Sequence, residues 1–215
     1  LISFISALTL LFAFSAKADF TGGVSLIMGT ADTDGKETEK EVTGVTSQVT
    51  SKSLSEDFFG ASIFAEYELD NGMALGVDYV PLDVKLGAES RSDTANENAS
   101  DDDIGSRSAE ANIEGLVTIY AHVPIGPIYG IIGYHDADVT TKETLPTSKY
   151  GDVSINGYQV GVGYKMNALR FEVAYSDFDD ISITATGNTV SGKVKGQNKV
   201  EADADVLAAK ISLAF

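Results

Sequence analysis

The sequence predicts an all-β fold, an eight-stranded antiparallel up-and-down barrel. Three observations carry this prediction: apolar and polar residues alternate with period two, short and long gaps separate the alternating segments in turn, and helical spacing is absent. The predicted strands are residues 19–30, 57–70, 72–86, 110–124, 126–140, 153–166, 168–184 and 201–215. Because strands joined by tight turns pair antiparallel, this order of gaps describes a meander.

The first eighteen residues differ from the rest of the chain. An apolar run from Leu1 to Phe14 is followed by Ala16-Lys17-Ala18, the small-x-small pattern that a signal peptidase cleaves. The run is too short for a membrane-spanning helix. We therefore expect residues 1–18 to be a cleaved signal peptide, N-terminally incomplete because the chain begins with Leu1 rather than Met, and residues 19–215 to be the barrel.

In the first half of the barrel, long loops are expected at residues 31–56 and 87–109. The strands at 57–70 and 72–86 are separated by "DNG" at Asp70 to Gly72, which suits a hairpin turn. The stretch "FFGASIFAEYEL" shows the alternation clearly. Its apolar face holds Phe59, Ala61, Ile63, Ala65, Tyr67 and Leu69, and its other face holds Gly60, Ser62, Phe64, Glu66 and Glu68.

In the second half, "PIGP" at Pro124 to Pro127 and a turn at Asn167 are the short connections. Long loops are expected at residues 141–152 and 185–200. The closing stretch "VLAAKISLAF" again alternates, with Leu207, Ala209, Ile211, Leu213 and Phe215 on one face. All long loops then lie on one side of the barrel, and both termini lie on the other.

Alternation alone does not say whether the apolar face meets lipid or encloses a ligand, as in a soluble lipocalin-like carrier. Residue size favours lipid, because the polar face is rich in glycine, which suits a narrow interior. Aromatic residues also gather toward the two ends of the apolar face, as in the girdles of membrane barrels. They are Phe20, Tyr67, Tyr164, Phe171 and Phe215 near the short turns, and Phe59, Tyr79, Tyr134, Tyr158 and Tyr175 near the long loops. The prediction is therefore a transmembrane β-barrel.

Composition excludes several classes of protein. The formal net charge of -17 argues against a nucleic-acid partner, because such a field repels phosphate backbones. The chain has no cysteine, which excludes a disulfide scaffold and a lipid-anchored lipoprotein.

With these features the chain resembles the small outer-membrane β-barrels of Gram-negative bacteria, the OmpA/OmpX type and the wider outer-membrane β-barrel domain family. The resemblance implies a place in the bacterial outer membrane, with outer-membrane lipid, lipopolysaccharide and the outer-membrane assembly machinery as partners. In that family a last strand that ends on an aromatic residue is the assembly signal. The matching residues here are Leu207, Ile211, Leu213 and Phe215. The chain departs from the OmpA architecture because no peptidoglycan-binding domain follows the barrel.

The predicted inner face collects ionisable residues that must pair in a narrow lumen. The expected lumen charge network is Glu66, Glu68, Asp78, Glu114, Lys165, Arg170, Glu172 and Lys210. Arg170 is the best candidate for its centre, because the planar guanidinium binds carboxylates with two bonds. His122 and His135 also face inward. A structural plug and gated ion passage are both compatible with this set.

The predicted loops differ in charge. Residues 31–56 and 87–109 are acidic, and residues 185–200 are basic. A solvated surface is the simple interpretation of such runs. Asp101, Asp102 and Asp103 are weak metal candidates, which could bind Ca²⁺ or Mg²⁺ between the loops and lipopolysaccharide phosphates. Divalent cations at the acidic loops are thus candidate partners.

The sequence indicates a structural or surface-interaction role, with acidic extracellular loops and a closed polar lumen. The alternative is a narrow porin-like channel for ions or small solutes. A lipid-modifying outer-membrane enzyme has less support, because it needs a histidine beside a serine and a carboxylate. Asp136 and Asp138 follow His135, which could meet a loop serine, but a lone histidine is more often structural. We expect no catalytic residues and no cofactor.

Overall fold

The computed structural model describes residues 20–39, 48–93, 105–144, 148–184, 186–187 and 199–215. The predicted signal peptide at residues 1–18 and the candidate ligands Asp101, Asp102 and Asp103 lie outside these ranges. None of the described segments is a helix long and apolar enough to cross a membrane.

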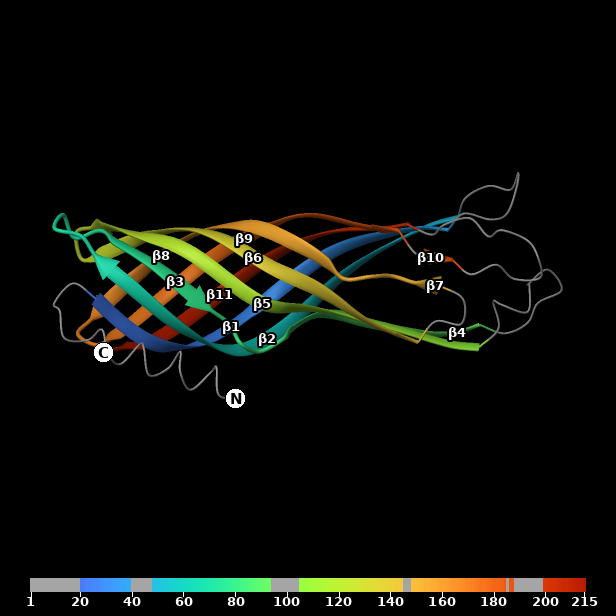
Figure 1. Ribbon diagram of the computed structural model, residues 1–215, viewed down its shortest axis with the longest axis horizontal. Helices are drawn as coiled ribbons and strands as arrows, with labels where there is room; N and C mark the ends of the chain where they lie inside the picture. The colour runs from blue at the N-terminus through green and yellow to red at the C-terminus, as the bar shows by residue number, and fades with distance from the viewer. Residues whose placement is uncertain (1–19, 40–47, 94–104, 145–147, 185, 188–198) are drawn as a thin grey trace.

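Nine antiparallel strands form one ring-like sheet (Figure 1). They are β1 (Phe20–Glu39), β2 (Gln48–Glu68), β3 (Ala74–Tyr79), β4 (Val84–Asp93), β5 (Gly105–Ile125), β6 (Ile128–Thr144), β8 (Val153–Met166), β9 (Leu169–Thr184) and β11 (Lys199–Ala214). Two short strands, β7 (Ser148–Lys149) and β10 (Thr186–Gly187), pair with each other. Since β3 and β4 both pair with β5, they share one position in the wall. The up-and-down barrel predicted from the sequence is therefore confirmed.

The last strand closes the ring against the first. β11 pairs with β1 from Ala214 opposite Gly23 to Lys199 opposite Thr38. Phe215 continues this pairing, because its backbone N–H donates to the Gly22 carbonyl (2.8 Å) and its carbonyl accepts from the Gly22 N–H (3.1 Å). Closure leaves no strand edge along this side of the wall.

The three short turns lie where the sequence predicts them. Gly72, Gly126 and Asn167 have φ values of 80°, 65° and 56°, the left-handed conformation that tight turns require. These turns and the C-terminus lie at one end of the barrel (Figure 1).

The outer surface nearest the short turns is an apolar belt. Large apolar side chains are exposed on it, among them Ile119 at 62% and Val160 at 57%. Aromatic rings lie at both margins of the belt and contact each other across strands, Phe20 with Tyr67 at 4.8 Å and Tyr134 with Tyr158 at 5.4 Å between ring centroids. The apolar face thus points outward, which excludes a soluble carrier with that face turned inward.

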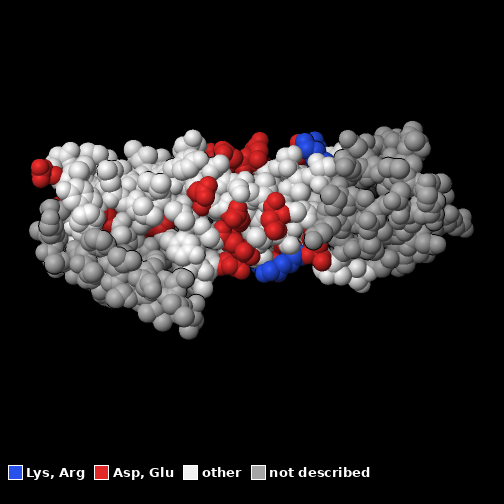
Figure 2. All heavy atoms as spheres, viewed as in Figure 1, with Lys and Arg blue, Asp and Glu red and all other residues white. Residues whose placement is uncertain are grey.

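Beyond the loop-side aromatic girdle the pattern of the long strands reverses. On β6, Ile132 and Tyr134 face outward, whereas the next outward residues are the exposed acids Asp136 and Asp138. The inward residue Val139 is buried and apolar. Figure 2 shows acidic side chains in a band beside the pale belt. Outward acids of this part include Asp32, Asp57, Asp136, Asp138, Asp177 and Asp205.

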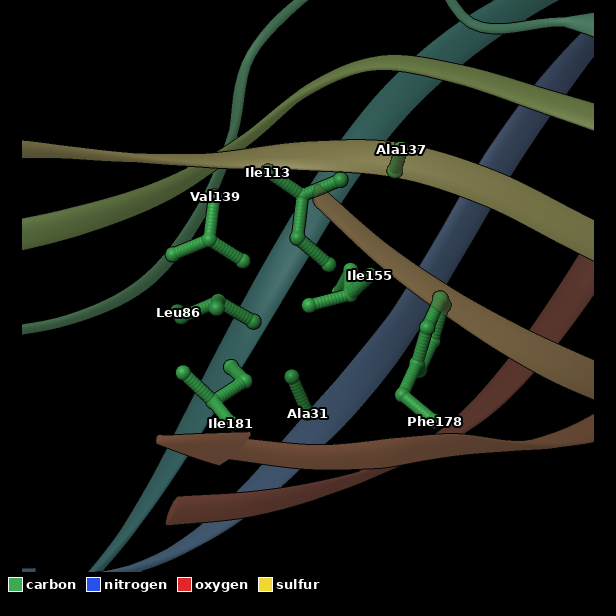
Figure 3. Close-up of a cluster of buried hydrophobic side chains, with 8 residues drawn as sticks. All are labelled: Ala31, Leu86, Ile113, Ala137, Val139, Ile155, Phe178 and Ile181. Atoms are coloured by element: carbon green, nitrogen blue, oxygen red, sulfur yellow. The ribbon is translucent and has the colours of Figure 1, made fainter. Parts of the chain in front are cut away.

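An apolar cluster fills the lumen inside the part of the wall that carries this acidic band. Eight inward side chains from six strands point toward one another there (Figure 3). They are Ala31, Leu86, Ile113, Ala137, Val139, Ile155, Phe178 and Ile181. The prediction of a polar lumen is therefore wrong for the loop side. The reason is that the wall stands in water there, so burying apolar residues inside stabilises it as in a soluble protein.

The strands are longer than predicted because they continue beyond the lipid, into the part of the wall that stands in water. Residues 31–39 and 48–56 are strand, although we predicted them as parts of one loop. The predicted loops at 87–109, 141–152 and 185–200 are likewise shortened by β4, β5, β6 and β11.

The predicted strand 72–86 is broken into β3 and β4. The break contains Pro81, which has no N–H to donate to a neighbouring strand. Val80 still donates its N–H to the Leu116 carbonyl (2.9 Å), so the chain stays attached to β5 through the break.

Candidate functional site: the lumen

The half of the lumen inside the apolar belt is filled by buried charged and aromatic side chains, which we call the ion-pair layer. These side chains come from β2, β3, β5, β6, β9 and β11. They are Glu66, Asp78, Tyr120, His122, Tyr129, Arg170, Glu172 and Lys210. All eight are inward-facing positions of the strand alternation.

Arg170 and Glu66 form the centre of the ion-pair layer. Arg170 Nη1 donates to Glu66 Oε2 (2.6 Å) and Nη2 donates to Oε1, a two-bonded pair with both side chains 3% exposed. The Arg170 guanidinium also lies 5.0 Å from the centroid of the Phe64 ring. Tyr120 Oη donates to Glu66 Oε2 (3.1 Å). Arg170, the predicted centre of a carboxylate cluster, thus bonds directly to one carboxylate, that of Glu66.

Lys210 joins two further carboxylates. Its Nζ lies 3.2 Å from Asp78 Oδ2 and 3.1 Å from Glu172 Oε2. Ser62 Oγ donates to the same Asp78 oxygen (2.9 Å), and Tyr129 Oη donates to Glu172 Oε1 (2.7 Å). Each buried carboxylate in the layer is thus held by a cation and a hydroxyl, as buried charges require.

His122 lies between the two groups. Its Nδ1 is 3.7 Å from Glu66 Oε2, and its Nε2 is 3.5 Å from Glu172 Oε1. The imidazole is stacked between Tyr120 and Tyr129, with ring centroids 4.6 Å and 4.4 Å away. The ring therefore connects the Arg170 and Lys210 groups.

Two glycines make room for the tyrosine rings of the layer. A Cβ at Gly76 would lie 2.3 Å from Tyr120 Cζ, and one at Gly163 would lie 2.3 Å from Tyr129 Cζ. Only glycine leaves the wall flat enough for these rings to lie against it. The glycine-rich inner face noted in the sequence thus has a specific packing role.

Five of the eight residues predicted for the charge network meet in the ion-pair layer: Glu66, Asp78, Arg170, Glu172 and Lys210. Glu68 and Lys165 form a separate, half-exposed pair at the short-turn mouth (3.5 Å).

Glu114 does not join the network. A bulge between Glu114 and Val117 shifts the alternation of β5. Glu114 consequently pairs with exposed Asp138, and its Oε1 accepts a hydrogen bond from Thr140 Oγ1 (2.7 Å). The positive φ of Gly115 (66°) in the bulge is the feature that regular alternation did not anticipate.

The contacts of the ion-pair layer cross the lumen between strands that are not neighbours in the ring. Glu66 on β2 meets Arg170 on β9, and Asp78 on β3 meets Lys210 on β11. Tyr120 and Tyr129 were not predicted as members of this layer. Their inward position opposite glycines is the signal that could have identified them.

A cavity of about 90 Å³ lies between the ion-pair layer and the apolar cluster. Its charged lining comes from Asp78, Glu172 and Lys210. Its apolar lining includes Phe58, Val80, Leu86, Ile113, Leu116 and Phe178.

His135 also lines the cavity, where it contacts two hydroxyl groups. Its Nδ1 lies 2.7 Å from Thr118 Oγ1, its Nε2 lies 2.9 Å from Ser176 Oγ, and the ring stacks on Phe178. His135 therefore contacts a serine of β9 rather than a loop serine. Within the described ranges its second nitrogen meets Thr118, not the carboxylate that a Ser-His-Asp arrangement uses. Nor do His, Asp and Glu side chains in those ranges form a group of three or more that could hold a metal ion.

The wall beside the cavity contains a seam between β2 and β4. β2 pairs with β3 only as far as Ile63 opposite Tyr79, and β4 pairs with β5. From Ile63 toward the loop-side end of β2, no strand pairing joins β2 to β4 in the described part of the chain. The seam is instead covered by a side chain, since a Cβ built at Gly87 would lie 2.8 Å from Leu54 Cδ1. Phe58 and Gly60 of β2 and Val84 and Leu86 of the β4 side line the cavity behind it.

An antiparallel ring with an apolar outer belt, aromatic girdles and a polar inner layer defines an outer-membrane β-barrel protein. The sequence matches the model of the Gram-negative porin family over residues 9–208, and the chain belongs to this family. No curated protein matches the chain.

Two solved structures resemble the fold. The outer-membrane protein OprG from Pseudomonas aeruginosa is 16% identical, with a TM-score of 0.50, and the match covers 90% of this chain and 96% of that one. The outer-membrane protein AlkL, solved in lipid bilayers, is 14% identical, with a TM-score of 0.52 and coverage of 90% of each chain. Family and fold together place the protein in the bacterial outer membrane.

Proposed function

We propose that this barrel moves small molecules between the lumenal cavity and the outer leaflet of the outer membrane through the β2–β4 seam, rather than along the barrel axis. Membership of the porin family supports passage without catalysis. The ion-pair layer opposes an axial route. The observation that carries the proposal is the stretch of β2 at residues 58–62, for which the described residues show no strand pairing on the β4 side and which borders the cavity.

Separating strands in lipid normally breaks hydrogen bonds that nothing else can replace. At the seam no ladder has to be broken, because side-chain packing, with Leu54 against Gly87, closes it. The seam starts just below Phe59, which is 69% exposed at the loop-side girdle, and continues into the part of the wall that stands in water. A small molecule could therefore reach the cavity from the membrane surface at low cost.

Locking the seam should stop passage. Leu54 Cγ, close to where a cysteine sulfur would lie, is 4.0 Å from a Cβ built at Gly87, so the pair Leu54→Cys and Gly87→Cys is placed for a disulfide after a small shift. We expect oxidised proteoliposomes to take up labelled glycerol and ethanolamine several-fold more slowly than wild type, and reduction to restore the rate.

The matched control places cysteines at Val160 and Tyr175, which already pair directly in the wall. Oxidation should leave uptake through this variant unchanged. If the locked seam passed solutes at the wild-type rate, the lateral route would be wrong.

A structural or surface-interaction role is the second candidate, and the closed ion-pair layer favours it. Planar-bilayer recordings should show no stable ion conductance under either proposal. Uptake of glycerol and ethanolamine separates them, because a purely structural barrel passes neither. In this second proposal the barrel binds lipopolysaccharide, and divalent cations bridge its phosphates to the acidic loops.

We also propose that Leu207, Ile211, Leu213 and Phe215 form the signal read by the outer-membrane assembly machinery. The three aliphatic side chains face outward, between 43% and 57% exposed, and Phe215 follows them at the rim. Deleting Phe215 should sharply lower the amount of protein in the outer membrane. The refolded deletion variant should keep most of its stability, because it loses two terminal backbone bonds and keeps the rest of the β1–β11 pairing.

The comparison variant is Phe215→Tyr, which keeps the ring and should insert normally. Quantifying folded protein in outer-membrane fractions by its heat-modifiable migration tests both variants. Normal levels of the deletion variant would show that the residue is not an assembly signal.

A further inference from the structure

We infer that the lumenal cavity is a binding site for small organic cations, with a short-chain primary ammonium as its simplest ligand. The inference rests on the proposed function, since it names the class of molecule that the same cavity would take. It follows from the charge, the hydrogen-bonding capacity and the size of the cavity.

The charges that line the cavity do not balance. Two carboxylates, Asp78 and Glu172, face one ammonium, that of Lys210. The third carboxylate of the ion-pair layer, Glu66, is matched by Arg170. Charges interact strongly where water is scarce, so the excess carboxylate favours a cationic ligand and repels an anionic one.

Asp78 has an oxygen available for such a ligand. It is 4% exposed and lines the cavity. Both of its side-chain bonds, from Ser62 and Lys210, are made to Oδ2. Among the described residues nothing donates to Oδ1, which can therefore accept a hydrogen bond from an ammonium. A bond between two charged groups is about twice as strong as a neutral one.

The hydroxyls beside His135 can accept further bonds. A neutral imidazole donates through one nitrogen and accepts through the other, so the chain Thr118–His135–Ser176 uses only part of the capacity of its two hydroxyl oxygens. Each hydroxyl oxygen has two lone pairs. An ammonium has three N–H groups, so it could bond to Asp78 and to one of these oxygens together.

The apolar residues that line the cavity, and its volume, limit the size of the organic part of the ligand. Phe58, Leu86 and Phe178 offer apolar contacts. A volume of about 90 Å³ is smaller than the cavity of about 150 Å³ that holds a benzene ring in another protein. The site therefore suits a molecule with on the order of four non-hydrogen atoms, such as n-propylammonium.

The test compares three probes of equal length, n-propylammonium, n-propanol and propionate. Each is titrated into the barrel in lipid nanodiscs while amide resonances of the cavity strands are followed by NMR. We expect n-propylammonium to bind most tightly and propionate not to bind. Asp78→Asn should weaken binding of n-propylammonium about tenfold or more, as expected for the loss of a charge-assisted bond. Asp136→Asn, which removes an exposed acid outside the barrel, should not change it.

A second variant covers the case in which Asp78→Asn fails to fold. Gly60 lines the cavity, and a Cβ there meets nothing within 4 Å, so Gly60→Leu should fill the space and abolish binding without disturbing the wall. Gly151→Leu, at another glycine with open space around it, is the matched control.

The outcomes separate this inference from the proposed function. Propionate binding as tightly as n-propylammonium, or full binding in Gly60→Leu, would overturn the cation site even if glycerol still passes through the seam. Selective ammonium binding without any solute uptake would support the site and overturn only the passage.

Discussion

Replacing Arg170 by methionine should lower the free energy of unfolding by about 3–5 kcal/mol, because it leaves Glu66 as an uncompensated buried charge. Arg170 is 2% exposed, and it forms both direct bonds between a cation and Glu66. Methionine keeps much of the side-chain length, so the loss reports the charge rather than a large cavity. Urea unfolding of the barrel in lipid vesicles, followed by Tyr fluorescence and gel migration, measures it.

The double variant Arg170→Met, Glu66→Gln should recover a large part of this loss, since no unpaired charge remains. Glu68→Gln is the control, because its pair with Lys165 is half exposed and worth no more than about 1 kcal/mol. A single Arg170→Met variant as stable as wild type would mean that the ion-pair layer does not hold the lumen together.

Gly23→Ala should destabilise the barrel by about 1–3 kcal/mol or more, the usual cost of overpacking. A Cβ at Gly23 would lie 2.4 Å from the Leu213 carbonyl oxygen, a backbone atom of the strand that closes the ring. It would also meet the tip of the Phe64 ring, which can rotate away, whereas the carbonyl cannot. The same unfolding measurement tests this variant.

Gly60→Ala is the matched substitution on the neighbouring strand. Its Cβ points into open space, so the variant should be as stable as wild type or more stable by up to about 1 kcal/mol through a less flexible unfolded chain. Equal stability losses in Gly23→Ala and Gly60→Ala would contradict the packing argument.

The architecture could be predicted from the sequence because each of its signals is local. Alternation in "LRFEVAYSDF" places Arg170 and Glu172 inside, and the turn residues Gly72 and Asn167 separate strands that must then pair. Pairing of the last strand with the first follows from closure. The ionisable residues of the inner face likewise indicated that charged side chains would have to pair in the lumen.

The features of the structure that were not predicted depend on the surroundings of a residue rather than on its type. Phe178 and Val139 lie at inward positions of the regular alternation, but these inward residues are apolar because the wall has left the lipid by that point. The bulge before Val117 and the break at Pro81 each change the register by an amount that no period reveals. The cavity and the seam depend on that break, so neither was predicted.

The reversal of apolar and polar faces along each strand also fixes the depth of the barrel in the bilayer. Sinking would carry Asp136 and Asp177 into hydrocarbon, and rising would bring Ile132 and Val173 into water. Vertical movement in either direction is therefore opposed on several strands at once. From Tyr134 to the end of β6 at Thr144, the paired wall rises roughly 25 Å above the outer girdle. The loop-side ends of the paired strands therefore stand at a set height above the lipid surface.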